Sequence, residues 1–213
     1  RAILRTQYRM VPPIGDLISA CFYDNELITK ERLRPAALIA AMPEAAIWLD
    51  TSGLPDHTET PGSDGRGFTN ATEQAQIVRW LEQLDKRLRA AQGGPPMKLR
   101  VLIMSSYLHQ VRALRRAAGA LERNLEHLEL EVNTVDAVQG READLVVFSV
   151  TRSNPRKDWG FMRSDARINV ALSRGRFGLV IVGDRDFARQ AGASLGRVAR
   201  FLDRQQEADD GST

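Results

Sequence analysis

Asp144–Val150 reads DLVVFSV and Phe177–Gly183 reads FGLVIVG, and these two apolar runs decide the class of fold. Neither run alternates apolar with polar residues, as a strand with one solvent-facing side would. Continuous Val-rich runs are typical of parallel strands that helices cover on both faces. Leu99–Ser105 (LRVLIMS) is a third run of this kind, and Leu130–Val135 (LEVNTV) is a fourth expected strand. We therefore expect an α/β domain around a mostly parallel sheet.

Helical patterns lie between these runs, as the crossovers of a parallel sheet require. Thr69–Ala91 has apolar residues at helical spacing behind a Thr or Asn cap, which predicts a long helix. Ala45–Asp50 predicts a short strand, and the stretch 42–75 around it is acidic and rich in loop residues. The other expected helices are Pro12–Tyr23, Tyr107–Glu122, Ser164–Leu172, Arg185–Gln190 and Leu195–Gln206. Residues 1–206 then form one domain, and 207–213 are expected to be a disordered tail.

The composition restricts the class of protein further. A chain of 213 residues is long enough for one well-buried domain, and its single Cys21 excludes an internal disulfide. No apolar run approaches the roughly 18–20 residues of a membrane span, so we expect an intracellular, cytoplasmic protein without a membrane partner. The three histidines lack metal-ligand spacing, and we expect no metal site.

The charge is unevenly distributed. Residues 152–204 contain twelve Lys/Arg and five Asp/Glu, whereas 42–75 contain one Arg and six acids. A basic C-terminal third favours polyanions such as phosphates or nucleic acid, although solvated helices alone would account for such a count equally well. Trp48, Trp80 and Trp159 are expected to be core or loop anchors, and a nucleic-acid contact is the alternative for Trp159, which lies close to Arg156 and Lys157.

Three polar stretches follow or precede the expected strands, and we expect all three at the carboxyl ends, where ligands gather in such sheets. The first is TQYRM, Thr6–Met10. Here Gln7 can read a base edge, Tyr8 can stack on a base, and Arg9 can reach a phosphate. The alternative is a buried tyrosine beside a salt-bridged arginine.

The second stretch is TVDAVQGREADLVVFSVTRSN. Thr134 can donate to a phosphate, Gly140 permits close approach of the backbone, and Glu142 can accept from sugar hydroxyls. A polar loop with a capping aspartate is the alternative interpretation. The third stretch is SDARINVALSRGRF, in which Arg167 and Arg174 share a face if the helix continues between them. A basic surface helix would explain it as well.

Taken together, LRTQYRM, SSYLHQ, VDAVQGREADLVVFSVTRS and GFMRSDARINVALSRGRFGLVIVGD resemble the second, C-terminal motor domain of superfamily 1 helicases. The similarity is greatest to the branch that contains the nonsense-mediated decay helicase and its DNA-processing relatives. It runs in the same order from about Leu4 to Gly183. The resemblance implies a RecA-like three-layer sandwich with a mostly parallel central sheet, the use of ATP and Mg²⁺, and single-stranded DNA or RNA as partner.

The resemblance also implies roles for single residues at the nucleotide. Tyr8 matches the residue that stacks on adenine, and Arg9 and Arg174 match the two arginines that contact the γ-phosphate. Gly140 and Glu142 match the Gln-Gly-x-Glu stretch, whose glutamate contacts the ribose and the metal side. Gln7 belongs to the same nucleotide-binding group.

Two further parts of the resemblance concern an arginine pair and the nucleic acid. Arg167 matches the second member of an arginine pair whose first position is Ala166 here, which puts that pair's joint role in doubt. The nucleic-acid residues implied by the family are Ser105, Ser106, Tyr107, Gln110 and Thr134, with a serine where the family has proline.

The chain contains no GxxxxGK[ST] phosphate loop, and GGPPMKL at Gly93–Leu99 has the wrong spacing for one. The resemblance implies that an N-terminal RecA-like domain of the same protein binds most of the ATP and the Mg²⁺. We therefore expect part of an ATP-dependent helicase or translocase whose isolated C-terminal domain does not hydrolyse ATP. The alternatives are a catalytically silent helicase-like binding or regulatory module, and a P-loop ATPase that switches without unwinding. Contacts to the backbone of a strand do not separate DNA from RNA.

Overall fold

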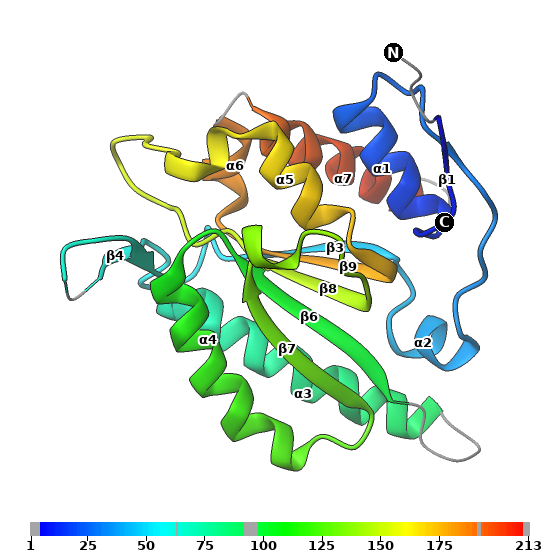
Figure 1. Ribbon diagram of the computed structural model, residues 1–213, viewed down its shortest axis with the longest axis horizontal. Helices are drawn as coiled ribbons and strands as arrows, with labels where there is room; N and C mark the ends of the chain where they lie inside the picture. Colours follow the sequence, from blue (N-terminus) through cyan, green and yellow to red (C-terminus); the bar gives the residue numbers. More distant parts are fainter. Residues whose placement is uncertain (1–4, 63, 92–97, 191–192, 211–213) are drawn as a thin grey trace.

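A parallel sheet forms the centre of the molecule (Figure 1). The computed structural model describes residues 5–62, 64–91, 98–190 and 193–210. Within these residues the central sheet has five strands in the order β3-β9-β8-β6-β7, and each neighbouring pair is parallel. The strands are β3 (Ala46–Asp50), β6 (Leu99–Ser105), β7 (Leu128–Thr134), β8 (Ala143–Ser149) and β9 (Gly175–Gly183).

Helices cover both faces of this sheet (Figure 1). Those on one face are α1 (Pro12–Phe22), α5 (Asp165–Leu172), α6 (Arg185–Gln190) and α7 (Ser194–Asp210). Those on the other are α2 (Ala36–Ala41), α3 (Ala71–Ala91) and α4 (Leu108–Leu121). Three short 3-10 turns, η1 (Glu122–Asn124), η2 (Asp136–Val138) and η3 (Gly160–Arg163), complete the described helical segments. The expected α/β class and three-layer sandwich are confirmed.

Apolar side chains of the central strands alternate between the two helical layers. In β6, Leu102 and Met104 pack in the cluster with α1, α5 and α7, whereas Val101 and Ile103 pack in the cluster with α3 and α4. Because both faces are covered, both sets are apolar, which is why the sequence runs show no polar alternation. Each fully buried Leu, Ile or Val contributes about 1.5–3 kcal/mol relative to an exposed one.

Short elements are where the structure adds to the sequence. Two-residue strands β1 (Thr6–Gln7) and β2 (Ile28–Thr29) pair in parallel, and β4 (Thr60–Pro61) pairs with β5 (Phe68–Thr69) in a hairpin. These strands and the six-residue α2 are too short to show a periodic pattern. Thr6 and Gln7 of the opening stretch therefore form a short strand that pairs with a segment later in the chain.

The C-terminal helix is longer than expected. α7 runs to Asp210, so residues 207–210 are helical and the expected disorder of that part is wrong. No helix breaker precedes Gly211, which explains why the helix continues after Gln206. Residues 211–213 and 92–97, which include the GGPP sequence at 93–96, lie outside the described residues. Among the helices that the structure describes, none combines the length and the apolar composition that crossing a bilayer demands.

Candidate functional site

The candidate residues divide between two opposite edges of the sheet. Glu142 directly precedes β8 and Arg174 directly precedes β9, so both lie at the amino edge. Ser105 and Thr134 end β6 and β7 and lie at the carboxyl edge. In a parallel sheet, a residue before a strand and a residue after one are separated by the length of that strand. The expectation that all three stretches gather at the carboxyl ends is therefore wrong for Glu142 and Arg174.

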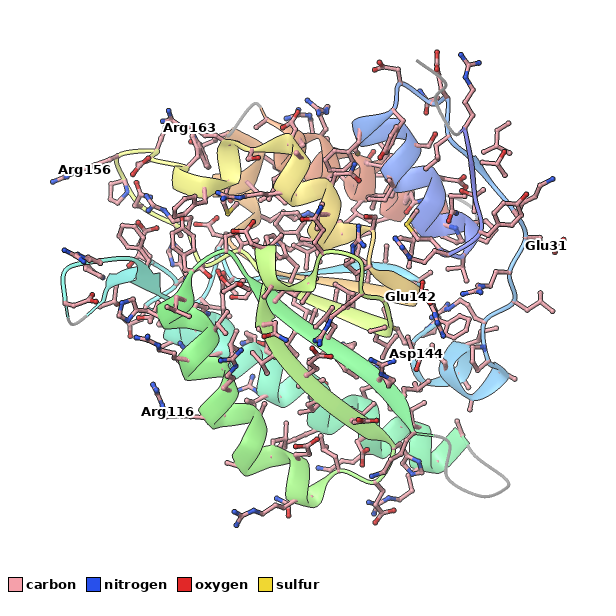
Figure 2. All side chains as sticks on the ribbon, in the orientation of Figure 1. Glu31, Arg116, Glu142, Asp144, Arg156 and Arg163 are labelled. Atoms are coloured by element: carbon pink, nitrogen blue, oxygen red, sulfur yellow. The ribbon has the colours of Figure 1, made fainter. Side chains whose placement is uncertain are left out.

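Glu142 joins two arginines at the amino edge, where Figure 2 labels it beside Asp144. Arg9 Nε donates to Glu142 Oε2 at 3.0 Å. Arg176 Nε donates to Glu142 Oε1 at 2.9 Å, and its Nη2 bonds the same oxygen. The bond from Arg176 is the largest cause that lowers the pKa of Glu142, with Arg9 acting in the same direction. Arg176 is not among the site residues expected from the sequence.

Arg174 lies next to Arg9 without a carboxylate of its own. Its Nε donates to the carbonyl of Val170 at 2.8 Å, and its Nη1 to that of Arg141 at 3.4 Å. Arg9 Nη1 donates to the carbonyl of Ser173 at 3.2 Å, directly before Arg174. Desolvation, and then the positive charge of Arg9, lower the pKa of Arg174. Within the described residues no ion pair neutralises Arg174, so the two guanidinium groups form a site suited to an anion with several oxygens.

The remaining residues of the opening stretch have separate roles. Gln7 Oε1 accepts from the backbone N–H groups of Arg9 and Met10, both at 2.9 Å, so this amide orders the turn instead of facing outward. Tyr8 is 67% exposed, and its ring can therefore meet a ligand. The alternative of a buried tyrosine beside a salt-bridged arginine is wrong for Tyr8 and correct for Arg9.

Gly140 directly precedes Arg141, whose carbonyl accepts from Arg174, whereas Arg167 lies apart from the arginines of the amino edge. Gly140 has φ +85°, which disfavours any side chain, and no atom would meet a Cβ there within 4 Å. Helix α5 ends at Leu172, so Arg174 lies beyond it and the expected common face with Arg167 does not form. Instead, Arg167 Nε donates to Asp136 Oδ1 at 3.1 Å, beside the carboxyl end of β7.

Three of the expected nucleic-acid residues are buried. Ser105 and Gln110 have no exposed surface and Tyr107 is 3% exposed. Ser105 Oγ bonds Thr151 Oγ1 at 2.8 Å, and Gln110 Nε2 donates to Ser149 Oγ at 2.9 Å. In this arrangement these side chains cannot touch a strand, because their polar groups are enclosed and bonded within the protein. The expected direct contacts of these three side chains with a nucleic-acid strand are therefore wrong. Their bonds within the protein help to position the carboxyl edge instead.

Ser106 and Thr134 are the two remaining members of that set, and both are half-buried. The Oγ of Ser106 is buried without a hydrogen-bond partner in the described structure. Thr134 Oγ1 accepts from the backbone N–H of Ala137 at 3.4 Å at the end of β7. Contacts from these two hydroxyls to a strand stay a prediction.

A buried carboxyl group behind this edge was missed by the sequence analysis. Glu73, in the first turn of α3, accepts from Ser149 Oγ at 2.5 Å and from the N–H of Thr151 at 2.8 and 2.9 Å. Burial raises the pKa of Glu73 to about 8 despite these bonds. The pattern Asn70-x-x-Glu73 predicts a capping box. Asn70 Oδ1 does accept from the Glu73 N–H, but Gln110 takes the place of the glutamate at the Asn70 N–H.

A second missed residue is Arg152, which anchors the loop that follows β8. It is 2% exposed, and its Nη2 lies 3.2 Å from Glu59 Oε1 and 2.9 Å from Asp158 Oδ2. Its guanidinium also lies 4.0 Å from the centre of the Phe68 ring. Acids of the 42–75 stretch thus hold the basic loop from inside. No three His, Cys, Asp or Glu side chains among the described residues are arranged to hold a metal ion.

Comparison with known proteins shows the family of this chain. Residues 1–186 match the model of the family described as AAA domain. The chain is 34% identical over 190 residues to the regulator of nonsense transcripts 1 homolog of Drosophila melanogaster, which covers 85% of this chain and 15% of that protein. It is 28% identical over 189 residues to an uncharacterized ATP-dependent helicase of Methanocaldococcus jannaschii, which covers 89% of this chain and 27% of that protein.

A similar solved structure is the C-terminal domain of a possible DNA helicase from Lactobacillus plantarum WCFS1, with a TM-score of 0.45 and 18% identity over 90% of this chain and 94% of that one. The fold assignment above rests on this chain's own sheet. The chain spans about a quarter or less of the length of the two curated relatives.

Proposed function

The chain belongs to the AAA domain family, as a C-terminal motor domain of the superfamily 1 helicase type, and from this premise we propose that it supplies two arginines to an ATP site shared with a P-loop domain. Arg9 and Arg174 would contact the γ-phosphate, and the exposed Tyr8 would stack on the adenine. The carboxyl edge, with Ser106 and Thr134, would bind single-stranded DNA or RNA. The other domain would bind Mg²⁺ and most of the nucleotide.

The observation that carries this proposal is the pairing of Arg9 with Arg174 at the amino edge. Desolvation is the largest cause that lowers the pKa of Arg174, and repulsion from the adjacent guanidinium of Arg9 adds to it. An anion between the two groups relieves that repulsion. Arg174 is oriented by backbone carbonyls and not by a carboxylate. A phosphate can therefore bind Arg174 without first breaking an ion pair. Glu142 and Arg176 hold Arg9 in place beside it.

The chemistry of phosphoryl transfer explains why such a pair would matter. Negative charge spreads over the equatorial oxygens of the transferred group in the transition state, and an arginine aimed there contributes roughly 10³–10⁵ in rate. An arginine that reaches the nucleotide from a second domain makes turnover depend on closure of the two domains. Opening and closing can then move the protein along a strand.

The test is Arg174→Ala in the longer protein that joins this chain to its P-loop domain. We expect kcat for ATP to fall roughly 10³-fold or more, with nucleotide affinity changed much less. Arg116→Ala, on the exposed face of α4, is the matched control and should leave kcat unchanged. An unaltered kcat in Arg174→Ala would reject the arginine role and favour a nucleic-acid-binding module that does not drive hydrolysis. The isolated 213-residue chain should show only background Mg²⁺-dependent hydrolysis.

A further inference from the structure

The loop after β8 holds an exposed phenylalanine on a well-ordered support. Phe161 is 53% exposed and is the second residue of η3. Asp158 accepts from buried Arg152 at 2.9 Å, and its N–H donates to Asn154 Oδ1 at 3.0 Å. Asn154 Nδ2 returns a bond to the carbonyl of Asp158 at 2.9 Å. Because the loop is bonded from several sides, the exposure of Phe161 is built into it.

The position of the ring is set by its neighbours. The N–H of Phe161 donates to Tyr107 Oη at 3.3 Å, and the two rings meet edge to face with centres 5.7 Å apart. Gly160 has φ +49°, and a Cβ there would lie 2.5 Å from Tyr107 Oη. This close approach requires glycine. Tyr107, one of the expected nucleic-acid residues, is buried and therefore supports the ring of Phe161 from the protein interior.

One cation lies against the exposed ring, and further cations are exposed in the same loop. The guanidinium of Arg167 lies over Phe161 at 5.0 Å from the ring centre. The side chain of Arg163 is 70% exposed, and Arg156 and Lys157 are exposed in the same loop. Figure 2 shows Arg156 and Arg163 pointing outward at the end of the molecule opposite Glu142. An isolated exposed apolar residue is ordinary, but Phe161 has a guanidinium over its ring and lies in a loop with three further exposed cations. Such a surface fits a nucleic acid, which combines flat bases with a negatively charged backbone.

Trp159 is the loop anchor that the sequence analysis expected of a tryptophan, and not the alternative nucleic-acid contact. Its ring packs on Phe187 of α6, with the centres 3.9 Å apart, and the residue is half-buried. It anchors the loop, and Phe161 two residues later takes the exposed position.

We propose that Phe161 is a stacking platform for one base of a single strand, with Arg163 and Arg167 contacting the adjoining phosphates. The base would stack on the ring face opposite Arg167. This inference rests on the proposed function, because it names the surface on which the strand of that function lies. It also moves Arg167 from the nucleotide to the strand, in agreement with its place beside the carboxyl edge.

The test measures binding of the 213-residue chain to a fluorescent single-stranded oligothymidine by anisotropy, and to a strand of equal length that carries abasic sites. Base–aromatic stacking of about 1–3 kcal/mol predicts that Phe161→Ala weakens binding to oligothymidine on the order of 10-fold. Phe161→Trp should keep the affinity. Neither variant should alter binding to the abasic strand. Ile39→Ala removes a similarly exposed apolar residue from α2 and should change nothing.

Charge provides an independent readout. Arg163→Ala should lower the slope of log affinity against log salt by about 0.7, the value for one phosphate contact on a single strand. An unchanged affinity of Phe161→Ala for oligothymidine, or an equal loss on the abasic strand, overturns the stacking role while strand binding by the domain stands. If the unaltered chain binds neither strand, the strand-binding part of the proposed function fails, and this inference with it. Circular dichroism of each variant establishes that it is folded.

Discussion

Replacing Glu73 by glutamine should remove a pH dependence from the stability of this domain. The carboxyl group of Glu73 is fully buried, and burial, followed in effect by the negative charges of Asp184 and Glu59, raises its pKa from 4.5 to about 8. Bonds from Ser149 and Thr151 oppose the shift but do not cancel it. Between these two values the folded protein holds a proton that the unfolded chain has released. The free energy of unfolding therefore falls as pH rises through this window.

The size of the effect follows from the shift. One bound proton changes the free energy of unfolding by about 1.4 kcal/mol per pH unit, so the loss between pH 5.5 and 7.5 is up to about 3 kcal/mol. Glutamine keeps the shape of the side chain and an oxygen for the Thr151 N–H, but it does not titrate. We expect Glu73→Gln to flatten the dependence of stability on pH over this range by that amount.

Urea denaturation of the wild type and of Glu73→Gln, followed by circular dichroism at half-unit steps from pH 5 to 8.5, measures both slopes. Glu82→Gln, at an exposed position of the same helix, is the control and should follow the wild type at every pH. Parallel curves for the wild type and Glu73→Gln would refute the argument, since they would mean that Glu73 has the same protonation in the folded and unfolded states.

Three other substitutions, one of them with a matched glycine control, test the supports of the two sites. Arg152→Ala should lower the free energy of unfolding by about 3–5 kcal/mol in urea titrations, because it leaves Glu59 buried without its cation; a loss below about 1 kcal/mol would contradict that role. Gly160→Ala should lower the free energy of unfolding in urea by about 1–3 kcal/mol, because Gly160 has a positive φ and a Cβ there would lie 2.5 Å from the Tyr107 hydroxyl. A midpoint of denaturation that does not fall would contradict this expectation. Gly119→Ala, in an open position of helix α4, should instead stabilise by about 0.5–1 kcal/mol. Glu142→Gln should change stability by less than about 1 kcal/mol, as partly exposed ion pairs contribute little, yet lower ATP turnover of the longer protein through the loosened Arg9; unchanged turnover would argue against Glu142 as a positioning residue.

The sequence was sufficient for the class of fold and for most of the long elements. The apolar runs at Leu99–Ser105 and Phe177–Gly183 are strands at or near those bounds, and the helical pattern ending at Ala91 is α3. These elements are predictable because burial on both faces of a strand, or on one stripe of a helix, imposes a composition that repeats over many residues. Elements of two to six residues, such as β1 and α2, carry no such repeat.

Sequence similarity also identified the polar stretches that matter, but it could not say which side chains face outward. Ser105 and Gln110 have the same polar groups whether they lie on the surface or within a network, and the packing of α3 and α4 against β8 encloses them. The opposite holds for Phe161. An apolar residue in a loop reads as a core anchor until Gly160 and Tyr107 are seen to hold its ring outside.

By itself, then, the sequence determined a parallel α/β domain, its family and the arginines that we propose as nucleotide contacts. Burial of a helix or strand imposes a local pattern of apolar residues, and this pattern can be read directly from the sequence. The tertiary structure alone decided that Arg9 and Arg174 meet at the amino edge while Arg167 lies with Phe161 beside the carboxyl edge. The physical reason is the direction of the chain in a parallel sheet, where each connecting helix returns from the carboxyl edge to the amino edge. Helix α5 makes this return, so Arg167 near its start and Arg174 just beyond its end lie at different edges.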